Sequence, residues 1–299
     1  MNVPGPSVLV TGATGFVGSH LVHALVRAGL PVMILKLSTS DTRRVADLLQ
    51  AVAIHDVDAA PLRTAFVRPI DVVIHLATSY GRSGETAEQV ADANVGFPTR
   101  LLQLAIDQNV PAFFTTDTFS TKAAEASDVL GPYVRSKKEF REFATALVRG
   151  TRTTFTNVQL EHVYGPLDAS FKFVPSLLRA FLANDPTFDL TPGEQARDFV
   201  YVDDVVEAYM TLVRQHRDLP SRDGHFEVGT GTSVPLSTFV KRAHALAGST
   251  TRVRFGALPY RSSELMHSRA DTAAMRHLGW SASVSLDDGL NRTIQSMRP

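Results

Sequence analysis

The sequence contains no cysteine, no excess of charge of either sign and no long uninterrupted hydrophobic run. Without cysteine the chain can form no disulfide, thiolate metal site or thiol nucleophile, and nothing places it in an oxidising compartment. Its 30 Lys and Arg residues balance 30 Asp and Glu residues, so no long-range field attracts nucleic acid or an anionic membrane. We therefore expect neither as a partner, and we predict no metal site.

The hydrophobic pattern also argues against a membrane span or a signal peptide. Crossing a bilayer takes about 18 consecutive apolar residues, and even the segment 21–35 is interrupted by His23 and Arg27. The first residues carry no basic segment, and the first apolar run is only three residues long, Val8 to Val10. These features favour a cytoplasmic protein.

In the first half of the chain, short apolar runs alternate with segments of helical periodicity. Strands are predicted at 7–10, 31–37, 71–76, 112–116 and 156–163, and helices at 16–28, 42–50, 87–108 and 133–148. Strands that are apolar on both faces and alternate with helices indicate a parallel sheet covered on both sides. We expect an α/β fold with a doubly wound parallel sheet.

The pattern becomes mixed after residue 165. Short strands are predicted near Phe188, Phe199, Phe226 and Val253, between helices at 174–183, 205–214 and 236–247. We expect a first domain of residues 1–165 and a smaller mixed α/β lobe of residues 166–299, of which about 198–229 return to the first domain. The cleft between the two, at the carboxyl ends of the strands, is the expected ligand site.

A glycine-rich turn lies between the first predicted strand and helix. It reads Thr11-Gly12-Ala13-Thr14-Gly15-Phe16-Val17-Gly18, with its glycines at G-x-x-G-x-x-G spacing. Glycines allow a tight turn and close backbone approach, and the helix N-terminus offers free N–H groups to a pyrophosphate. The turn predicts a dinucleotide site, and a tight βα turn without a ligand is the alternative.

Residues after the other strands complete this candidate cofactor site. An adenine and a ribose would rest against Asp56, Val57, Leu76, Ala77 and Thr78, which otherwise cap a loop and end a strand. An acid usually follows the second strand when the cofactor is NAD, but this sequence has Lys36, with Arg43 and Arg44 close behind. Because a cation attracts a 2′-phosphate, the sequence favours NADP(H), with NAD(H) and a solvated Lys36 as the alternative.

Tyr133 and Lys137 stand four residues apart in a predicted helix, so both side chains lie on one face. An ammonium beside a phenol would lower the phenol pKa from about 10 and make Tyr133 an acid or base near neutral pH. Thr116 ends the preceding strand, where its hydroxyl could hold a substrate oxygen or simply cap the strand. A Tyr-x-x-x-Lys pair or a threonine at a strand end can also arise by chance. The prediction therefore depends on where Thr116, Tyr133 and Lys137 lie relative to the predicted strand and helix.

Taken in order, these motifs resemble the extended short-chain dehydrogenase/reductases, in the nucleotide-sugar epimerase/dehydratase group. The series continues with Val163-Tyr164-Gly165-Pro166 and with Arg197 to Asp204, and it covers nearly the whole chain. Within the group the sequence is most similar to the 4-ketoreductases related to CDP-abequose synthase, because of Lys36 and the Thr115-Thr116-Asp117-Thr118 run. The resemblance implies a Rossmann sheet.

The resemblance also implies roles for individual residues. Thr116, Tyr133 and Lys137 would be the catalytic hydroxyl, acid/base and lysine, and Lys137 would bind the nicotinamide ribose. Arg197 and Arg261 would pair with a sugar-nucleotide diphosphate, unless Arg197 pairs with Asp198 and Arg261 is a surface charge. The group further suggests cofactor contact for Asn94 and substrate contacts for Thr78, Ser79, Thr116, Asp117, Thr118, His162 and Lys172.

Two departures from the group's pattern narrow the expected reaction. Dehydratases carry an Asp-Glu pair after the catalytic Thr, whereas this sequence has Asp117-Thr118, so elimination of water lacks its second carboxylate; Asp117 would otherwise cap the turn. His162 stands where the group usually has Asn, and it either contacts a sugar hydroxyl or packs.

The sequence therefore predicts an NADP(H)-dependent reductase of a nucleotide-linked 4-keto-deoxysugar. A 4-epimerase would use the same three catalytic residues and is the main alternative. A second alternative is a dinucleotide-sensing protein without catalytic activity. The presence of all three catalytic candidates, Thr116, Tyr133 and Lys137, disfavours it. The family also suggests a homodimer through the helices near Asn94 and Tyr133.

Overall fold

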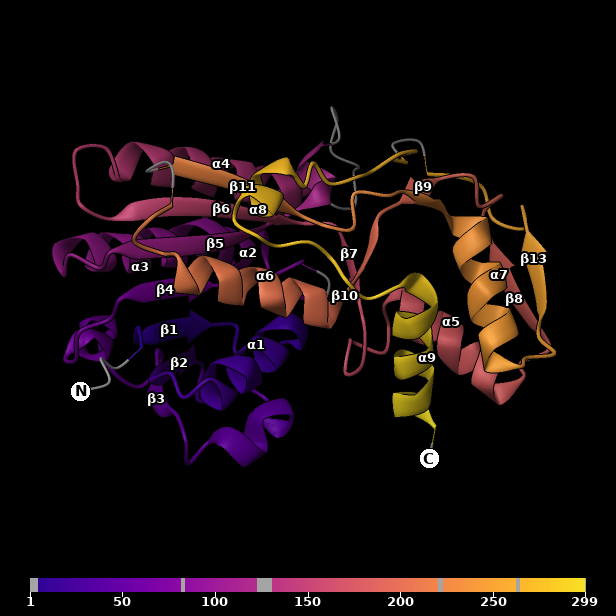
Figure 1. Ribbon diagram of the computed structural model, residues 1–299, viewed down its shortest axis with the longest axis horizontal. Helices are drawn as coiled ribbons and strands as arrows, with labels where there is room; N and C mark the ends of the chain where they lie inside the picture. The colour runs from indigo at the N-terminus through magenta and orange to yellow at the C-terminus, as the bar shows by residue number, and fades with distance from the viewer. Residues whose placement is uncertain (1–4, 82–83, 123–130, 220–222, 262–263, 299) are drawn as a thin grey trace.

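The computed structural model describes the chain apart from residues 1–4, 82–83, 123–130, 220–222, 262–263 and 299. A large parallel sheet with helices on both faces is joined to a smaller lobe of short strands and helices (Figure 1). Among the helices of the described part, none is both long enough and apolar enough to pass through a lipid bilayer.

Seven parallel strands form the central sheet, in the spatial order β11-β6-β5-β4-β1-β2-β3. They are β1 (Val8–Thr11), β2 (Val32–Lys36), β3 (Ala53–Asp56), β4 (Val72–His75), β5 (Ala112–Thr118), β6 (Thr154–Leu160) and β11 (Asp223–Val228). The order reverses at β1, which pairs with β2 on one side and β4 on the other. In such sheets a ligand binds beyond the carboxyl ends of the strands at this switch point. The doubly wound α/β fold is confirmed.

Helices cover both faces of the sheet. These elements are α1 (Phe16–Arg27), α2 (Ala87–Ala91), α3 (Phe97–Asp107), α4 (Gly131–Leu147) and α6 (Val202–Arg214), with short turns η1 (Arg43–Leu48), η2 (Leu62–Phe66) and η4 (Phe119–Lys122). On β5, Phe114 joins the core under α1 and α6, whereas Phe113 joins the core under α3 and α4. Alternate residues of a strand point to opposite faces, which is why the buried strands read as continuous apolar runs.

Two predicted helices differ from the structure, and one strand was not predicted. The segment predicted as a helix at 42–50 is only the 3-10 turn η1. The helix predicted at 87–108 contains a π-turn, η3 (Asp92–Gly96), between α2 and α3; Pro98, in the first turn of α3, has no N–H to bond one turn back, so the regular ladder cannot continue there. The edge strand β3 was missed because its two apolar residues, Ala53 and Ile54, are exposed and its other two residues are polar.

The strand predicted at 156–163 divides at Glu161 into β6 and β7 (His162–Tyr164). The Glu161 N–H bonds to Val228 O of β11, whereas the next N–H, of His162, bonds to Asp198 O. The chain therefore leaves the central sheet at this residue and pairs with β10 (Phe199–Tyr201) at the start of the smaller lobe. This divergence opens the space at the end of β6.

The smaller lobe has its own apolar core. It contains α5 (Phe173–Ala183), β8 (Thr187–Leu190), β9 (Ala196–Arg197), β12 (Val234–Pro235), α7 (Leu236–Ala247), β13 (Arg252–Phe255) and α9 (Leu286–Met297), while α8 (Ala273–His277) lies against β11. Phe199 and Phe239 stack with their ring centroids 3.9 Å apart at the centre of this core. Figure 1 shows the lobe beside the carboxyl ends of the central strands.

Candidate active site

A cavity of about 680 Å³ lies at the carboxyl ends of β1, β4, β5 and β6 and extends to the start of α5. Among the predicted site residues, its walls contain Gly12, Thr14, Gly15, Phe16, Val17, Gly18, Leu76, Ala77, Thr78, Ser79, Thr116, Asp117, Thr118, Tyr133, Lys137, His162 and Lys172. The fold thus brings the glycine-rich turn, the catalytic candidates and part of the substrate candidates to one place.

The glycine-rich turn is shaped for close backbone approach. Gly12 has a φ of +68°, and a Cβ there would come within 2.6 Å of the backbone nitrogen of Ala77. A Cβ at Gly18 would collide with the carbonyl oxygen of Gly12. Helix α1 begins directly after Gly15, which supplies no side-chain cap to its first N–H groups. These free donors and the absent side chains fit a dinucleotide pyrophosphate.

The cations expected near the adenosine end have different surroundings. Lys36 forms an ion pair with Asp56, while Val57 donates its N–H to the Lys36 oxygen at 2.9 Å. Arg43 is exposed and bonds to Asp41. Arg44 instead reaches the glycine-rich turn, donating from Nη1 to Thr14 O at 3.3 Å.

Lys36, Arg43, Asp56 and Val57 are not among the described residues that line the cavity. They lie beyond the glycine-rich turn, at the ends of β2 and β3 and in η1.

Asn94 is buried and lies in the π-turn rather than on the cavity wall. Its Oδ1 accepts from the Thr78 hydroxyl and the Ser79 N–H, and its Nδ2 donates to Ser79 O and to Ser136 Oγ. All its amide hydrogen-bonding capacity is used, so it joins the loop after β4 to helix α4. Its effect on a cofactor would pass through that loop.

The three catalytic candidates meet at the end of β5. Lys137 Nζ lies 6.0 Å from the centroid of the Tyr133 ring and donates to Thr116 O at 2.9 Å. The Thr116 hydroxyl contacts the hydroxyl of Tyr209, a buried residue of α6, at 2.5 Å. Tyr80 packs on Tyr133, with 4.7 Å between ring centroids.

Burial dominates the protonation of this group. It raises the pKa of Tyr133 well above the ordinary value, and the neighbouring Tyr80 and Asp117 add to the rise. The expectation that Lys137 would lower this pKa is therefore wrong for this arrangement. Burial also lowers the pKa of Lys137 to about 8, with Asp117 opposing the change. Near neutral pH Tyr133 is a protonated phenol and Lys137 is mainly a cation.

The carboxylates near this group are already engaged. Asp117 accepts from the Thr118 N–H at 2.7 Å and from Asn157 Nδ2 at 3.2 Å. Glu161 lines the cavity, but its Oε1 pairs with Lys122 Nζ at 2.6 Å and its Oε2 accepts from Ser268 Oγ at 2.6 Å. Glu85 also lines the cavity, and its Oε1 accepts from Ser79 Oγ at 3.0 Å. None of the three is a free acid or base.

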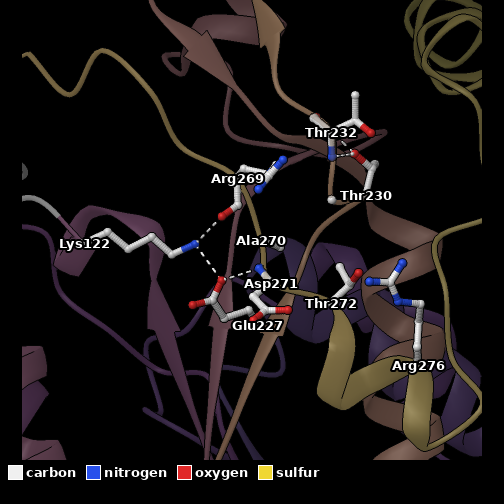
Figure 2. A pocket seen from close by; sticks show the side chains of 10 residues that line it. Lys122, Glu227, Thr230, Thr232, Arg269, Ala270, Asp271, Thr272 and Arg276 are labelled. Atoms are coloured by element: carbon white, nitrogen blue, oxygen red, sulfur yellow. Dashed lines mark hydrogen bonds and ion pairs between the residues drawn. The ribbon is translucent and has the colours of Figure 1, made fainter.

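Lys122, the partner of Glu161, makes further contacts outside the described cavity wall. It also pairs with Glu227 at 2.8 Å and donates to the backbone oxygen of Arg269 at 2.8 Å (Figure 2). This cluster links η4, the residue between β6 and β7, β11 and the segment before α8. Its members are far apart in sequence and share no local spacing, so sequence reasoning missed it.

At the substrate end, His162 lies between the rings of Phe119 and Phe199, at centroid distances of 4.5 and 5.5 Å. Burial lowers its pKa to about 3, so it is neutral. Its Nδ1 atom is buried without a hydrogen-bond partner among the described residues. Lys172 pairs with Asp168 at 2.9 Å and lies over the Phe16 ring.

The two arginines expected at a diphosphate lie outside the described cavity wall. Arg197 is buried and pairs with Glu264 at 2.6 Å, not with Asp198. Asp198 instead accepts from the N–H groups of Thr230 and Gly231. Arg261 is exposed. Sequence reasoning missed Tyr80, Tyr209 and Glu264. Of these three, Tyr80 alone had a local signal, because it directly follows the predicted residue Ser79.

A glycine-rich turn at a helix N-terminus, beside a Thr, Tyr and Lys at the ends of parallel strands, defines a dinucleotide-dependent short-chain dehydrogenase/reductase. The chain belongs to the NAD dependent epimerase/dehydratase family, whose model matches residues 8–229. It is 32% identical over 290 residues to CDP-abequose synthase of Salmonella muenchen, covering 96% of each chain.

Solved structures agree with this assignment. MoeE5 in complex with UDP-glucose and NAD is 27% identical, with a TM-score of 0.80 over 97% of this chain and 98% of that chain. The UDP-glucose 4-epimerase of Thermotoga maritima shares the fold, with a TM-score of 0.83, 23% identity and coverage of 97% of this chain and 98% of its own.

Proposed function

We propose that this protein is an NADP(H)-dependent reductase of a nucleotide-linked 4-keto-deoxysugar. The observation that carries the proposal is a protonated Tyr133 beside Thr116 and Lys137, in a cavity whose described carboxylates are all engaged. These carboxylates are Glu85, Asp117 and Glu161. Reduction needs one proton donor and one group to hold the oxygen, whereas dehydration needs a further acid and base. The 32% identity to CDP-abequose synthase supports the same substrate class.

The chain's own residues account for the proton and the oxygen. When bound, NADPH supplies a hydride to C4. Tyr133 donates its proton to the developing alkoxide, and the Thr116 hydroxyl holds that oxygen. Lys137, a cation below pH 8, binds the nicotinamide ribose and stabilises the phenolate that Tyr133 becomes. Its bond to Thr116 O keeps it beside both partners.

The preference for NADP(H) rests on Lys36 and Arg44. Lys36 occupies the position of the acid that would otherwise bind a ribose 2′-hydroxyl, and Arg44 contacts the glycine-rich turn at Thr14. All three cations have partners: Lys36 pairs with Asp56, Arg44 donates to the backbone oxygens of Thr14 and Leu167, and Arg43 pairs with Asp41. Of the two arginines, Arg44 is the one that contacts the glycine-rich turn, whereas Arg43 is exposed. The geometry therefore favours Arg44 as the second cation.

For the substrate, we assign a sugar hydroxyl to Nδ1 of His162, which has no hydrogen-bond partner in the described part of the chain. We assign the diphosphate to Arg197, Arg261 and Lys172. Binding at Arg197 would compete with its Glu264 partner. The homodimer and the cytoplasmic location expected from the sequence remain predictions.

A 4-epimerase is the second candidate, because UDP-glucose 4-epimerase shares the whole fold. An epimerase must retain its cofactor while the sugar is oxidised, rotated and reduced again. It would therefore purify with cofactor bound and consume none during turnover.

The test is a panel of CDP-, dTDP-, GDP- and UDP-linked 4-keto sugars, each assayed with NADPH and with NADH. We expect stoichiometric oxidation of NADPH with at least one of them. The epimerase is tested with UDP-glucose and other nucleotide-linked sugars that carry a C4 hydroxyl, because a 4-keto sugar has no C4 configuration to invert. Interconversion of their C4 epimers without net oxidation of the cofactor, and without reduction of any 4-keto sugar, would replace the reductase by the epimerase.

A further inference from the structure

Thr116 is held from two opposite sides. From α4, Lys137 Nζ donates to its backbone oxygen at 2.9 Å, and from α6 the Tyr209 hydroxyl meets its Oγ1 at 2.5 Å. Tyr209 has no exposed surface and packs in the core beneath α6. Thr116 itself is partly exposed and lines the cavity. A buried residue of the scaffold thus touches the hydroxyl expected to bind substrate.

The burial of Tyr209 decides which of the two hydroxyls donates. Within the described part of the chain, Thr116 Oγ1 is the one hydrogen-bond partner of the Tyr209 hydroxyl. If Thr116 donated, the phenolic proton would be left unpaired in the core, which is costly. Burial also raises the pKa of Tyr209, so this proton stays in place. Tyr209 therefore donates, Thr116 accepts, and the Thr116 proton is free for the cavity.

We propose that Tyr209 is a positioning residue for the reaction: its hydroxyl, by donating to Thr116 Oγ1, aims the Thr116 proton at the substrate oxygen that becomes the alkoxide. Accepting one hydrogen bond also makes Thr116 a stronger donor in the next, since bonded hydroxyls polarise one another. Tyr209 transfers no proton; O4 receives its proton from Tyr133. The inference rests on the proposed reductase function.

The direct test is Tyr209→Phe, which removes only the hydroxyl. We expect kcat to fall about tenfold, the effect of one hydrogen bond, with the KM for the sugar nucleotide and for NADPH unchanged. The matched control is Tyr164→Phe, which also removes one hydroxyl from a buried tyrosine. Tyr164 is 1% exposed, and its hydroxyl donates to Leu286 O in the smaller lobe. It should leave kcat unchanged.

A double-mutant cycle separates positioning from a general structural effect. In a Thr116→Val background there is no hydroxyl to aim, so adding Tyr209→Phe should cost no further kcat. A structural role would reduce kcat by the same factor in both backgrounds. That result, or wild-type kcat in Tyr209→Phe alone, would overturn the proposal.

A measurement that does not depend on turnover tests the Tyr209–Thr116 hydrogen bond separately from the proposed reductase function. If the wild-type protein reduces none of the 4-keto sugars, the reductase assignment fails, but the Tm values of the same four proteins still report the hydrogen bond. Tm shifts that are not additive support the coupling of Tyr209 to Thr116. Additive shifts would overturn it.

Discussion

Lys36 and Asp56 form an ion pair between neighbouring strands, with Nζ and Oδ1 2.5 Å apart. They are register partners at the ends of β2 and β3, and only 12% of the lysine side chain is exposed. The pair joins the residue expected at the 2′-phosphate to one expected at the adenine. Asp56 therefore orients the lysine while neutralising part of its charge.

The first prediction is that Lys36→Ala loses the preference for NADPH over NADH. A charge-assisted contact to the 2′-phosphate is worth about 1.5 to 3 kcal/mol, or roughly 10- to 150-fold in affinity. Alanine is preferable to aspartate here, because aspartate would place two carboxylates together at Asp56. Cofactor dissociation constants measured by fluorescence check the change.

Arg43→Ala is the matched control for cofactor choice, since Arg43 is a nearby cation that is already paired with Asp41. It should keep the NADPH preference. Equal binding of NADH and NADPH by the wild-type protein would show that the charge of Lys36 does not select the cofactor.

The second prediction concerns Tyr133 and Lys137. Tyr133→Phe removes the proton donor and should lower kcat by about 10²- to 10⁴-fold, and Lys137→Ala should also be severely impaired because the phenolate loses its cation. Both variants should keep the fold, checked by circular dichroism and Tm. Near-wild-type turnover by Tyr133→Phe would exclude it from the mechanism.

The third prediction is a fall in kcat as the pH rises through about 8. Burial lowers the pKa of Lys137 to about 8, so its ammonium is present below that pH and lost above it. Tyr133 does not titrate in this range, because its pKa is raised. A Lys137→Arg variant that retains activity should lose this fall, since the guanidinium stays charged. A wild-type kcat that stays constant to pH 10 would contradict the assignment.

The fourth prediction is that the protein does not make a 4-keto sugar by dehydration. Eliminating water across C5 and C6 needs a base and an acid besides Tyr133. Asp117 holds its own turn, and Glu161 is bound on both oxygens by Lys122 and Ser268. Glu85, the third described carboxylate of the cavity, accepts from the Ser79 hydroxyl. Purified protein with nucleotide-linked 6-hydroxy hexoses should give no 6-deoxy-4-keto product in a chromatographic assay. Its formation at a catalytic rate would reverse this assignment.

The sequence by itself determined the features that depend on local chain geometry. The glycine spacing from Gly12 to Gly18 reports a turn that side chains would block. The four-residue spacing of Tyr133 and Lys137 places both on one side of α4, because that is close to one helical turn. The alternation of apolar strands and helices likewise indicated a doubly wound sheet.

Tertiary structure alone decided which partners these residues have, and with them the protonation of the site. Tyr209 lies 93 residues from Thr116, and Glu264 lies 67 residues from Arg197. No local pattern encodes such pairs, because they follow from the packing of α6 and the smaller lobe against the sheet. The raised pKa of Tyr133 has the same origin. A neighbouring lysine can be read from spacing, but the burial that outweighs its charge exists only once the chain has folded around it.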